Sequence, residues 1–282
     1  MNFGGIAPEY CIYDKSPIVV LPVPFDATST WIKGADKGPE AILEASANME
    51  LYDIETDSEV YLQGIYTADP VTDPSSPEIL ADKVRARVLQ FLDDDKFVVT
   101  LGGEHSVTIG VVQAYTQKYK DISVLQIDAH TDLRPEYEGS RFNHACVMSR
   151  VREMCPFVQV GIRSMDIIEK PFIFPDRIFY AKDITGSDKS WMDSVINRLS
   201  DKVYLTIDLD GFDPSILPAT GTPEPGGLGY YDVIMLIKKL IQRKQLLGFD
   251  VVELCPTEGN KASDFLASKL IYQILSYQFQ NK

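Results

Sequence analysis

The strongest indication of how this chain folds is the stretch Ile122-Ser123-Val124-Leu125-Gln126-Ile127-Asp128-Ala129-His130-Thr131-Asp132, where an apolar run ends in acids and an imidazole. The run is rich in apolar and β-branched residues, as is typical of a buried strand. The stretch Val203–Asp210 is built in the same way and ends in Asp208-Leu209-Asp210. A third stretch, Phe97–His105, ends in two glycines, which would allow a tight turn, followed by Glu104 and His105. The sequence therefore predicts three strands, Phe97–Leu101, Ile122–Ile127 and Val203–Ile207, whose carboxyl ends carry polar side chains.

Similar short runs alternate with helical patterns along the rest of the chain. This alternation is typical of an α/β fold with a parallel sheet that helices cover on both faces. The further predicted strands are Ile18–Pro22, Phe157–Val160, Arg177–Tyr180 and Leu247–Val252. The predicted helices run from Pro39 toward Met49, from Pro77 through Leu92, and over roughly Ser106–Tyr119, Ala145–Met154, Lys189–Leu199, Tyr230–Gln242 and Ser263–Phe279. Because no internal repeat or low-complexity linker divides residues 1–282, we expect a single domain.

The composition limits the possible partners and the compartment. With 27 Lys and Arg against 41 Asp and Glu, the formal net charge is −14, which repels nucleic acids and anionic membranes and attracts a cation. No apolar run is long enough to span a membrane, and residues 1–10 lack the pattern of a signal peptide. The four cysteines, Cys11, Cys146, Cys155 and Cys255, have neither metal-binding nor disulfide spacing. We therefore expect free thiols in a cytoplasmic protein without nucleic-acid or membrane partners.

Six side chains at the predicted strand ends suit metal ions. Ligands bind outside the carboxyl ends of the strands in open α/β sheets, so one edge would collect His105, Asp128, His130, Asp132, Asp208 and Asp210. Residues i and i+2 of an extended chain point to the same side, which would pair Asp128 with His130 and Asp208 with Asp210. Four carboxylates are costly to bury together unless cations neutralise them. Carboxylates and imidazoles without a thiolate suit Mn²⁺ or a similar divalent ion. Taken singly, each segment is more often a turn or a helix cap, but the three together favour a site for two metal ions.

These segments resemble the signatures of a known family, the ureohydrolases, which include arginase and agmatinase. The three signature-like segments are Gly102–Ser106, Asp128–Arg134 and Ile207–Pro214, and the similarity extends to Gly161–Ser164, Gly221–Gly227 and Val251–Pro256. The resemblance implies a three-layer α/β/α sandwich with a mostly parallel sheet, assembled as a homotrimer or homohexamer. It also implies that a small cationic guanidino substrate is hydrolysed with release of urea.

The resemblance further implies two Mn²⁺ ions per subunit, for which Ni²⁺ or Co²⁺ could substitute. One ion would be held by His105, Asp128, Asp132 and Asp208. The other would be held by His130, Asp128, Asp208 and Asp210. Asp128 and Asp208 would therefore bridge the two ions.

Three further roles follow from the same resemblance. Glu253 matches the family's acid that pairs with the guanidinium, although a salt bridge within the protein is the plainer alternative. His144 matches a histidine that moves a proton or contacts the substrate, and its alternative is a packed or helix-capping role. Asp132 matches the candidate for delivering a proton to the leaving nitrogen.

The substrate is predicted from the loops. The segments Arg134–His144 and Gly221–Gly227 look more like those of agmatinases, so agmatine, cleaved to putrescine and urea in polyamine biosynthesis, is the leading substrate. Its amine could be attracted by Glu136, Glu138 or Glu224.

Other substrates and other classes stay open. Arginine or guanidinobutyrate would need a cation for its carboxylate, for which the candidates are Arg134, Arg141 and Arg163; guanidine would need neither partner. An inactive regulatory or assembly protein of the same fold is a more remote alternative, because every predicted ligand position is occupied by a ligand residue. A two-metal phosphoesterase is disfavoured because these segments contain no P-loop and no basic cluster.

Overall fold

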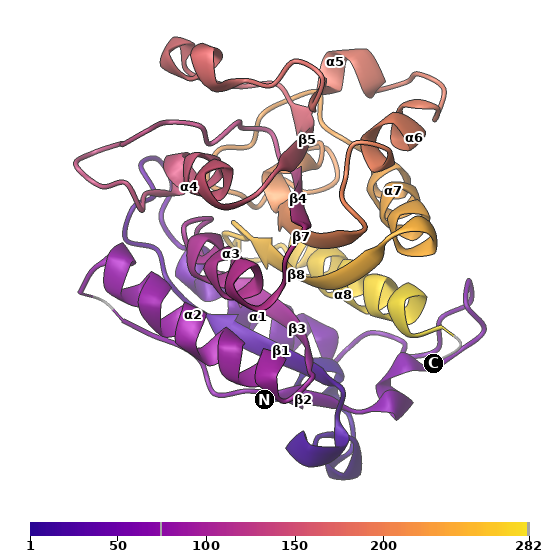
Figure 1. Cartoon of the computed structure of the whole chain (residues 1–282). Helices are drawn as coiled ribbons and strands as arrows, with labels where there is room; N and C mark the ends of the chain where they lie inside the picture. Colours follow the sequence, from indigo (N-terminus) through magenta and orange to yellow (C-terminus); the bar gives the residue numbers. More distant parts are fainter. Residues whose placement is uncertain (74, 281–282) are drawn as a thin grey trace.

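The computed structural model of the chain describes residues 1–73 and 75–280, and eight strands within them form one sheet (Figure 1). The order across the sheet is β2-β1-β3-β8-β7-β4-β5-β6, and every neighbouring pair is parallel. The strands are β1 (Ile18–Val23), β2 (Ile65–Thr67), β3 (Phe97–Gly102), β4 (Ile122–Ile127), β5 (Phe157–Ile162), β6 (Ile178–Tyr180), β7 (Lys202–Asp208) and β8 (Gln245–Val252). An all-parallel sheet must be covered on both faces.

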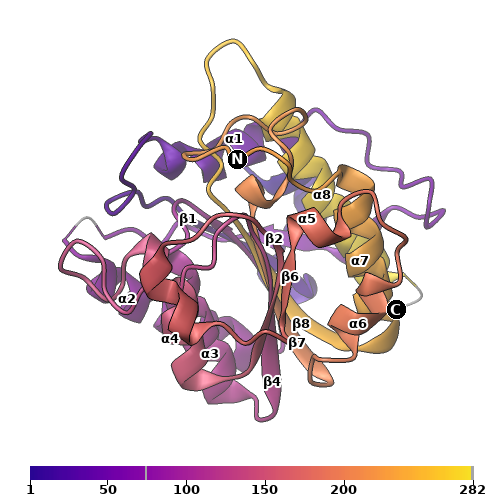
Figure 2. The same ribbon diagram turned by 90° about the horizontal axis from the view of Figure 1, so that it is seen from above.

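Helices provide that cover, and Figure 2 shows them on both sides of the sheet. The helices are α1 (Gly38–Ser46), α2 (Pro77–Asp93), α3 (Val107–Lys118), α4 (Val147–Met154), α5 (Ala181–Ile184), α6 (Trp191–Ile196), α7 (Tyr230–Arg243) and α8 (Ala262–Phe279). Buried residues of α2, α3 and α4 form one hydrophobic cluster, and those of α1, α6, α7 and α8 form another. Along β7, Val203 and Leu205 belong to the second cluster while Tyr204 belongs to the first. The predicted three-layer α/β/α fold is confirmed.

The seven predicted strands are present with ends shifted by at most two residues. The prediction missed β2, a three-residue edge strand that is too short to show a pattern. Helix α1 ends at Ser46 and not near Met49, because the backbone continues there in tighter turns, with Asn48 N donating to Ala45 O. Helix α4 begins two residues later than predicted, after a 3₁₀ turn at His144–Cys146. Helix α6 is shorter than predicted and α5 was not predicted.

The two glycines at the end of β3, Gly102 and Gly103, act by close packing and not by a tight turn. Neither Gly102 nor Gly103 has a positive φ. A Cβ on Gly103 would lie 2.0 Å from the carbonyl oxygen of Phe25. The backbone of Glu104 donates to that same oxygen at 2.8 Å. Gly103 therefore lets the end of β3 lie directly against the segment that follows β1, whereas a Cβ on Gly102 would meet Val107 and Val252.

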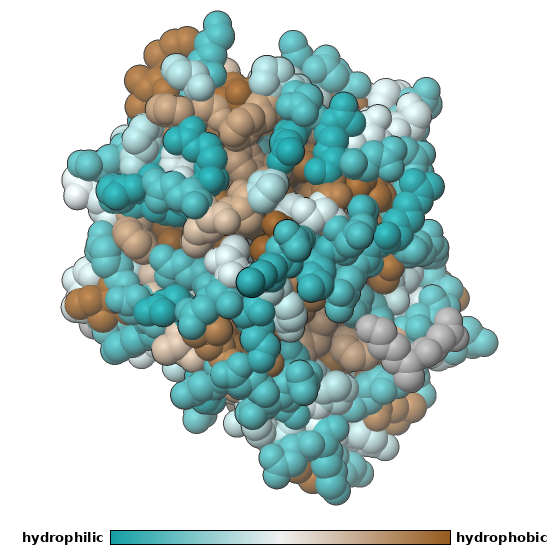
Figure 3. Space-filling model, in the orientation of Figure 1, coloured by the Kyte–Doolittle hydropathy of each residue, from teal (hydrophilic) through white to brown (hydrophobic). Residues whose placement is uncertain are grey.

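The surface and the cysteines agree with the composition. Most of the face in Figure 3 is hydrophilic. No helix among residues 1–73 and 75–280 is long and apolar enough to cross a membrane. The four cysteines are free thiols, as predicted. The single-domain organisation stays a prediction, which the one sheet running from Ile18 to Val252 supports.

Candidate metal centre

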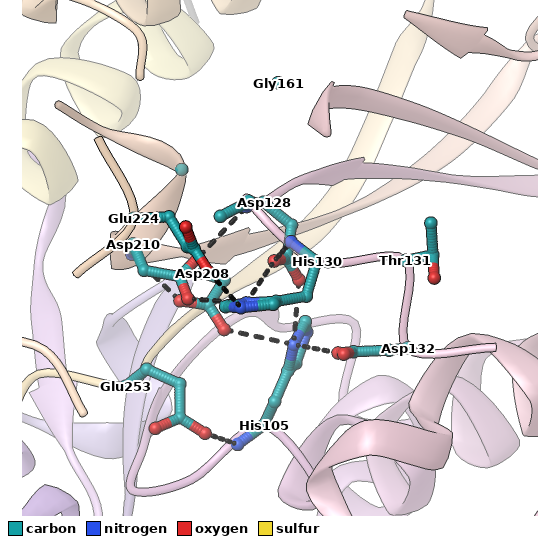
Figure 4. A network of polar contacts seen from close by, with 12 residues as sticks. His105, Asp128, His130, Thr131, Asp132, Gly161, Asp208, Asp210, Glu224 and Glu253 are labelled. Atoms are coloured by element: carbon teal, nitrogen blue, oxygen red, sulfur yellow. Dashed lines mark hydrogen bonds and ion pairs between the residues drawn. The ribbon is translucent and has the colours of Figure 1, made fainter. Parts of the chain in front are cut away.

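The carboxyl ends of four adjacent strands bring the predicted polar side chains together (Figure 4). His105 follows β3 and Glu253 follows β8, while the acids come from the ends of β7 and β4. The site contains all six predicted metal ligands, namely His105, Asp128, His130, Asp132, Asp208 and Asp210. Five of them are buried and His130 is half-buried. A buried cluster of this charge needs a cation or protons to be stable.

One half of the cluster surrounds the Nδ1 atom of His105. The nearest carboxylate oxygens of Asp132, Asp128 and Asp208 lie 3.0, 3.2 and 3.3 Å from it. Even so, this buried nitrogen has no hydrogen-bond partner of acceptable geometry. Three carboxylate oxygens that converge on one ring nitrogen form a donor set for a divalent cation.

The other half is centred on His130. Its Nδ1 lies 2.8 Å from Asp210 Oδ2 and 3.7 Å from Asp128 Oδ1. Two groups of potential ligands thus result, one of His105, Asp128 and Asp132 and one of Asp128, His130 and Asp210. Asp128 belongs to both, and it is one of the two residues predicted to bridge.

The acids converge because the chain turns at the end of each strand. We had expected them to converge because residues i and i+2 of an extended strand point to the same side, and that expectation was wrong. Strand β4 ends at Ile127, and Asp128 then accepts a hydrogen bond at Oδ1 from the backbone of His130 at 2.5 Å. Asp208 likewise accepts at Oδ1 from the backbone of Asp210 at 2.9 Å. A carboxylate that binds the amide two residues on closes a compact turn.

The electrostatics of the cluster fit bound cations. Burial and the negative charges of Asp132 and Asp210 raise the pKa of Asp128 to about 7. Burial, Asp210 and Asp128 also raise the pKa of Asp208 well above its usual range. These carboxyl groups therefore resist ionising together, and divalent cations would allow all of them to be ionised at neutral pH.

A buried network that the sequence did not reveal fixes the ring of His105. Its Nε2 lies 2.9 Å from Thr206 Oγ1, which donates in turn to Asp250 Oδ1 at 2.6 Å. Because the single hydroxyl proton of Thr206 is directed to Asp250, the proton on His105 must be at Nε2. When a metal ion takes the place of a proton at Nδ1, the lone pair of Nδ1 points at the three carboxylates. Asp250 Oδ2 accepts from Tyr204 at 2.6 Å and from Thr108 at 3.0 Å.

Thr206→Val should weaken metal binding on the His105 side. Loss of the outer partner of a metal ligand typically costs about 10–100-fold in affinity. Metal titration followed by calorimetry measures this change, and Thr206→Ser should restore most of the affinity because it keeps the hydroxyl. Equal affinities for the valine variant and the original protein would show that Thr206 does not orient His105.

Two of the predicted site residues have left-handed backbone conformations. Asp132 has φ 51° and Glu253 has φ 65°. Such conformations are unfavourable for residues with a Cβ, and they concentrate at functional sites. Here they turn both carboxylates toward the cluster, which no sequence pattern predicted.

A cavity of about 320 Å³ opens over the cluster. Its floor includes His105, Asp208 and Glu253. Its walls come from four loops and include the residues Thr30, Trp31, Ile32, Arg134, Tyr137, His144, Ser164, Met165, Asp166 and Thr222. His144 and Glu253 are therefore placed where a ligand above the cluster would touch them.

Glu253 is the carboxylate on the cavity floor beside His105. Its Oε1 accepts a hydrogen bond from the backbone of His105 at 2.7 Å. Burial, followed by the charge of Glu104, raises the pKa of Glu253 well above its usual range. A bound cation would hold this carboxyl group ionised.

Glu104 is a site residue whose role the sequence did not reveal. It is completely buried. It accepts hydrogen bonds from the backbone of Thr28 at 2.5 Å and of Ser29 at 3.0 Å, and from the hydroxyls of Thr28 and Ser106 at 2.7 and 2.6 Å. Glu104 therefore fixes the loop after β1 against the end of β3. In the sequence, this role was indicated only by the position of Glu104 within Gly-Gly-Glu-His.

The three arginines considered as carboxylate partners are all engaged within the protein. Arg163 donates to main-chain oxygens, including those of Asp210 at 2.6 Å and Glu224 at 2.7 Å. Arg141 pairs with Glu153. Arg134 lines the cavity but pairs with Asp166 at 3.0 Å and stacks on Tyr137.

Of the three predicted amine-attracting acids, Glu224 lies nearest to the cluster. Its Oε1 is 3.9 Å from His130 Nε2, and its side chain is 36% exposed. None of the three acids lines the cavity, and Glu136 and Glu138 are exposed. The open side of the site therefore carries a partly free negative charge.

Comparisons with known proteins give consistent matches. The arginase family model matches residues 16–276. The N(1)-aminopropylagmatine ureohydrolase of Synechocystis sp. is 41% identical over 276 residues, covering 94% of this chain and 90% of that protein. The agmatinase of Pyrococcus horikoshii is 35% identical, covering 91% and 90%. The solved structure of the agmatine ureohydrolase of Thermoplasma volcanium has a TM-score of 0.88 and 31% identity, covering 99% of this chain and 94% of that one.

Proposed function

Because the chain belongs to the arginase family, we propose that it hydrolyses a guanidino compound with an amine tail and releases urea. Membership of the arginase family confirms the resemblance seen in the sequence. It means that the chain is a hydrolase of the ureohydrolase type. It also argues against the phosphoesterase alternative. The observation that carries the proposal is the pair of ligand groups that share Asp128 beneath the cavity.

The chain's own residues supply binding and proton handling. Two divalent ions, held by His105, Asp128, Asp132 and Asp208 and by His130, Asp128, Asp208 and Asp210, would supply Lewis acidity that makes water nucleophilic at neutral pH.

Glu253 accepts hydrogen bonds from the planar guanidinium, whose fork matches a carboxylate. This contact holds the guanidino carbon above the cluster. His144 contacts the substrate or moves a proton, and Asp132 delivers a proton to the leaving nitrogen.

An amine tail is favoured over a carboxylate tail by the charges around the cavity. Arg134, Arg141 and Arg163 each have partners within the protein, so a substrate carboxylate would have to break one of these contacts. Glu224 offers a negative charge at the open side of the site. Agmatine, giving putrescine and urea, fits this arrangement.

A longer substrate, N(1)-aminopropylagmatine, is the second candidate. The relative with 41% identity carries that name. The cavity rim adds a structural reason, because Trp31 is 77% exposed and Ile32 and Met165 lie nearby on the cavity wall. An indole face binds ammonium groups, so the rim suits a tail that extends beyond the first amine.

Urea release from a panel of substrates tests the proposal. Agmatine, N(1)-aminopropylagmatine, arginine, guanidinobutyrate and guanidine would each be supplied with Mn²⁺, Ni²⁺ or Co²⁺. We expect urea from the two amine-tailed compounds and little from the others. Preference for arginine or guanidinobutyrate would refute the amine tail, and no urea from any compound would favour the inactive regulatory alternative.

Glu224→Gln should raise KM for agmatine with little change in kcat. An exposed ion pair contributes about 0.2–1 kcal/mol, which corresponds to a change of roughly 1.4- to fivefold. The matched control is Glu136→Gln, which removes an exposed carboxylate that, unlike Glu224, has no contact with His130, and it should leave KM unchanged. If both variants behave alike, Glu224 has no part in binding the tail.

Three further parts of the proposal come from the sequence. The physiological metal is Mn²⁺, the protein assembles as a homotrimer or homohexamer, and it works in the cytoplasm. Metal analysis of the purified protein and light scattering test the first two.

A further inference from the structure

A hydrogen-bonded chain outside the metal cluster connects Glu104, Thr28 and His144 beside the cavity. Thr28 Oγ1 lies 2.7 Å from Glu104 Oε1 and 3.1 Å from His144 Nδ1. The backbone amide of His144 also donates to Thr28 Oγ1 at 3.0 Å. Thr28 and His144 are 116 residues apart in the sequence, so the contact depends on the fold.

Counting protons along this chain determines the direction of each hydrogen bond. Glu104 receives two backbone N–H groups and the hydroxyl of Ser106, so its carboxylate acts as an acceptor. An ionised carboxylate can only accept, and a threonine hydroxyl has one proton. Thr28 therefore donates to Glu104, and its lone pairs accept from His144.

We propose that Thr28 is a positioning residue that fixes the neutral tautomer of His144, with the proton on Nδ1 and the lone pair on Nε2. The proposal rests on the proposed function only where it concerns turnover. The ring lines the cavity, and its edge meets Tyr137 with centroids 6.3 Å apart. No described residue hydrogen-bonds Nε2, which leaves that nitrogen to a ligand.

The tautomer matters because the proposed substrate group has donors only. A guanidinium carries N–H groups and no acceptor, so a ring that presented Nε2–H would repel it. With the lone pair at Nε2, His144 accepts a hydrogen bond or a proton there. The same nitrogen then releases that proton to solvent in the cavity, while Nδ1–H stays on Thr28, so the ring ends each cycle unchanged. The partner of one imidazole nitrogen thus sets the chemistry of the other.

The first test is spectroscopic and does not depend on turnover. Only three histidines are present, so ¹⁵N-histidine spectra of protein loaded with diamagnetic Zn²⁺ are simple, and His144→Asn assigns the signals. We expect protonated Nδ1 and unprotonated Nε2 in the original protein and a mixture of tautomers in Thr28→Val. Protonated Nε2 in the original protein, or identical spectra for both proteins, would overturn the proposal.

The second test is kinetic and separates positioning from folding. Thr28→Val should lower kcat/KM about 10–100-fold, if the partner of His144 matters as much as the outer partner of a metal-bound histidine does, and Thr28→Ser should restore it to within about threefold. Thr116→Val, which removes a hydroxyl bonded only within α3 and to Met154, controls for general loss of stability.

A double-mutant cycle supplies the remaining evidence. If Thr28 acts through His144, Thr28→Val should have no further effect in a His144→Ala background. A loss of the same size in both backgrounds would overturn the proposal. If the original protein releases no urea from any substrate, the proposed function fails, and the spectra still decide the tautomer.

Discussion

Asp128→Asn should leave at most one of the two metal ions bound and remove most of the urea release. Within the described residues, Asp128 is the carboxylate that both ligand groups share, and it is completely buried. Asparagine keeps the size of the side chain but lacks the charge that two cations require. Loss of an outer partner of a ligand costs about 10–100-fold, so loss of a shared ligand should cost more than about 100-fold in kcat/KM.

Metal content per subunit and urea release, measured on the same sample, check this result. The matched control is Asp201→Asn, because the side chain of Asp201 is 99% exposed and pairs only with Lys244 at the surface. It should keep both ions and full activity. Two bound ions and near-normal turnover in Asp128→Asn would disprove the ligand assignment.

Glu253→Gln should have the opposite signature, with both ions bound and substrate handling impaired. Glutamine can still accept the hydrogen bond from the backbone of His105, but it cannot neutralise a guanidinium. Removing one partner of a buried charge pair costs about 2–5 kcal/mol, or at least roughly 30-fold in kcat/KM.

The control for this variant is Glu258→Gln, the same change at an exposed position. Metal analysis should find equal occupancy in both variants, whereas only Glu253→Gln should lose activity. Loss of metal from Glu253→Gln would mean that Glu253 maintains the cluster and not the substrate contact.

The parts of the fold that depend on local pattern could be predicted from the sequence. The central strands are short apolar runs, and β4 was predicted to the residue because Ile122–Ile127 is bounded by charged residues. The six polar side chains were found because they follow such runs directly. Parallel strands carry their carboxyl ends to one edge, so the sheet itself determines that these side chains meet.

The supporting contacts could not be predicted because they join distant segments. Thr206 and Asp250 lie in apolar strand patterns, and their role depends on His105, which is 101 residues before Thr206. Thr28 lies in a loop with no periodicity. The left-handed backbone of Asp132 and Glu253 is likewise imposed by surrounding structure and not by residue type.

Arg163 holds the cavity loops by their main chain, which has a consequence for engineering. Every residue type offers a carbonyl oxygen, so exchanging the side chains of Thr222 and Glu224 would leave this anchor in place. Lysine at position 163 would replace a planar fork by a single ammonium and could not reach as many acceptors. Libraries randomised at residues 222 and 224 should therefore yield folded variants with altered tail preference, whereas libraries that include position 163 should yield many misfolded ones.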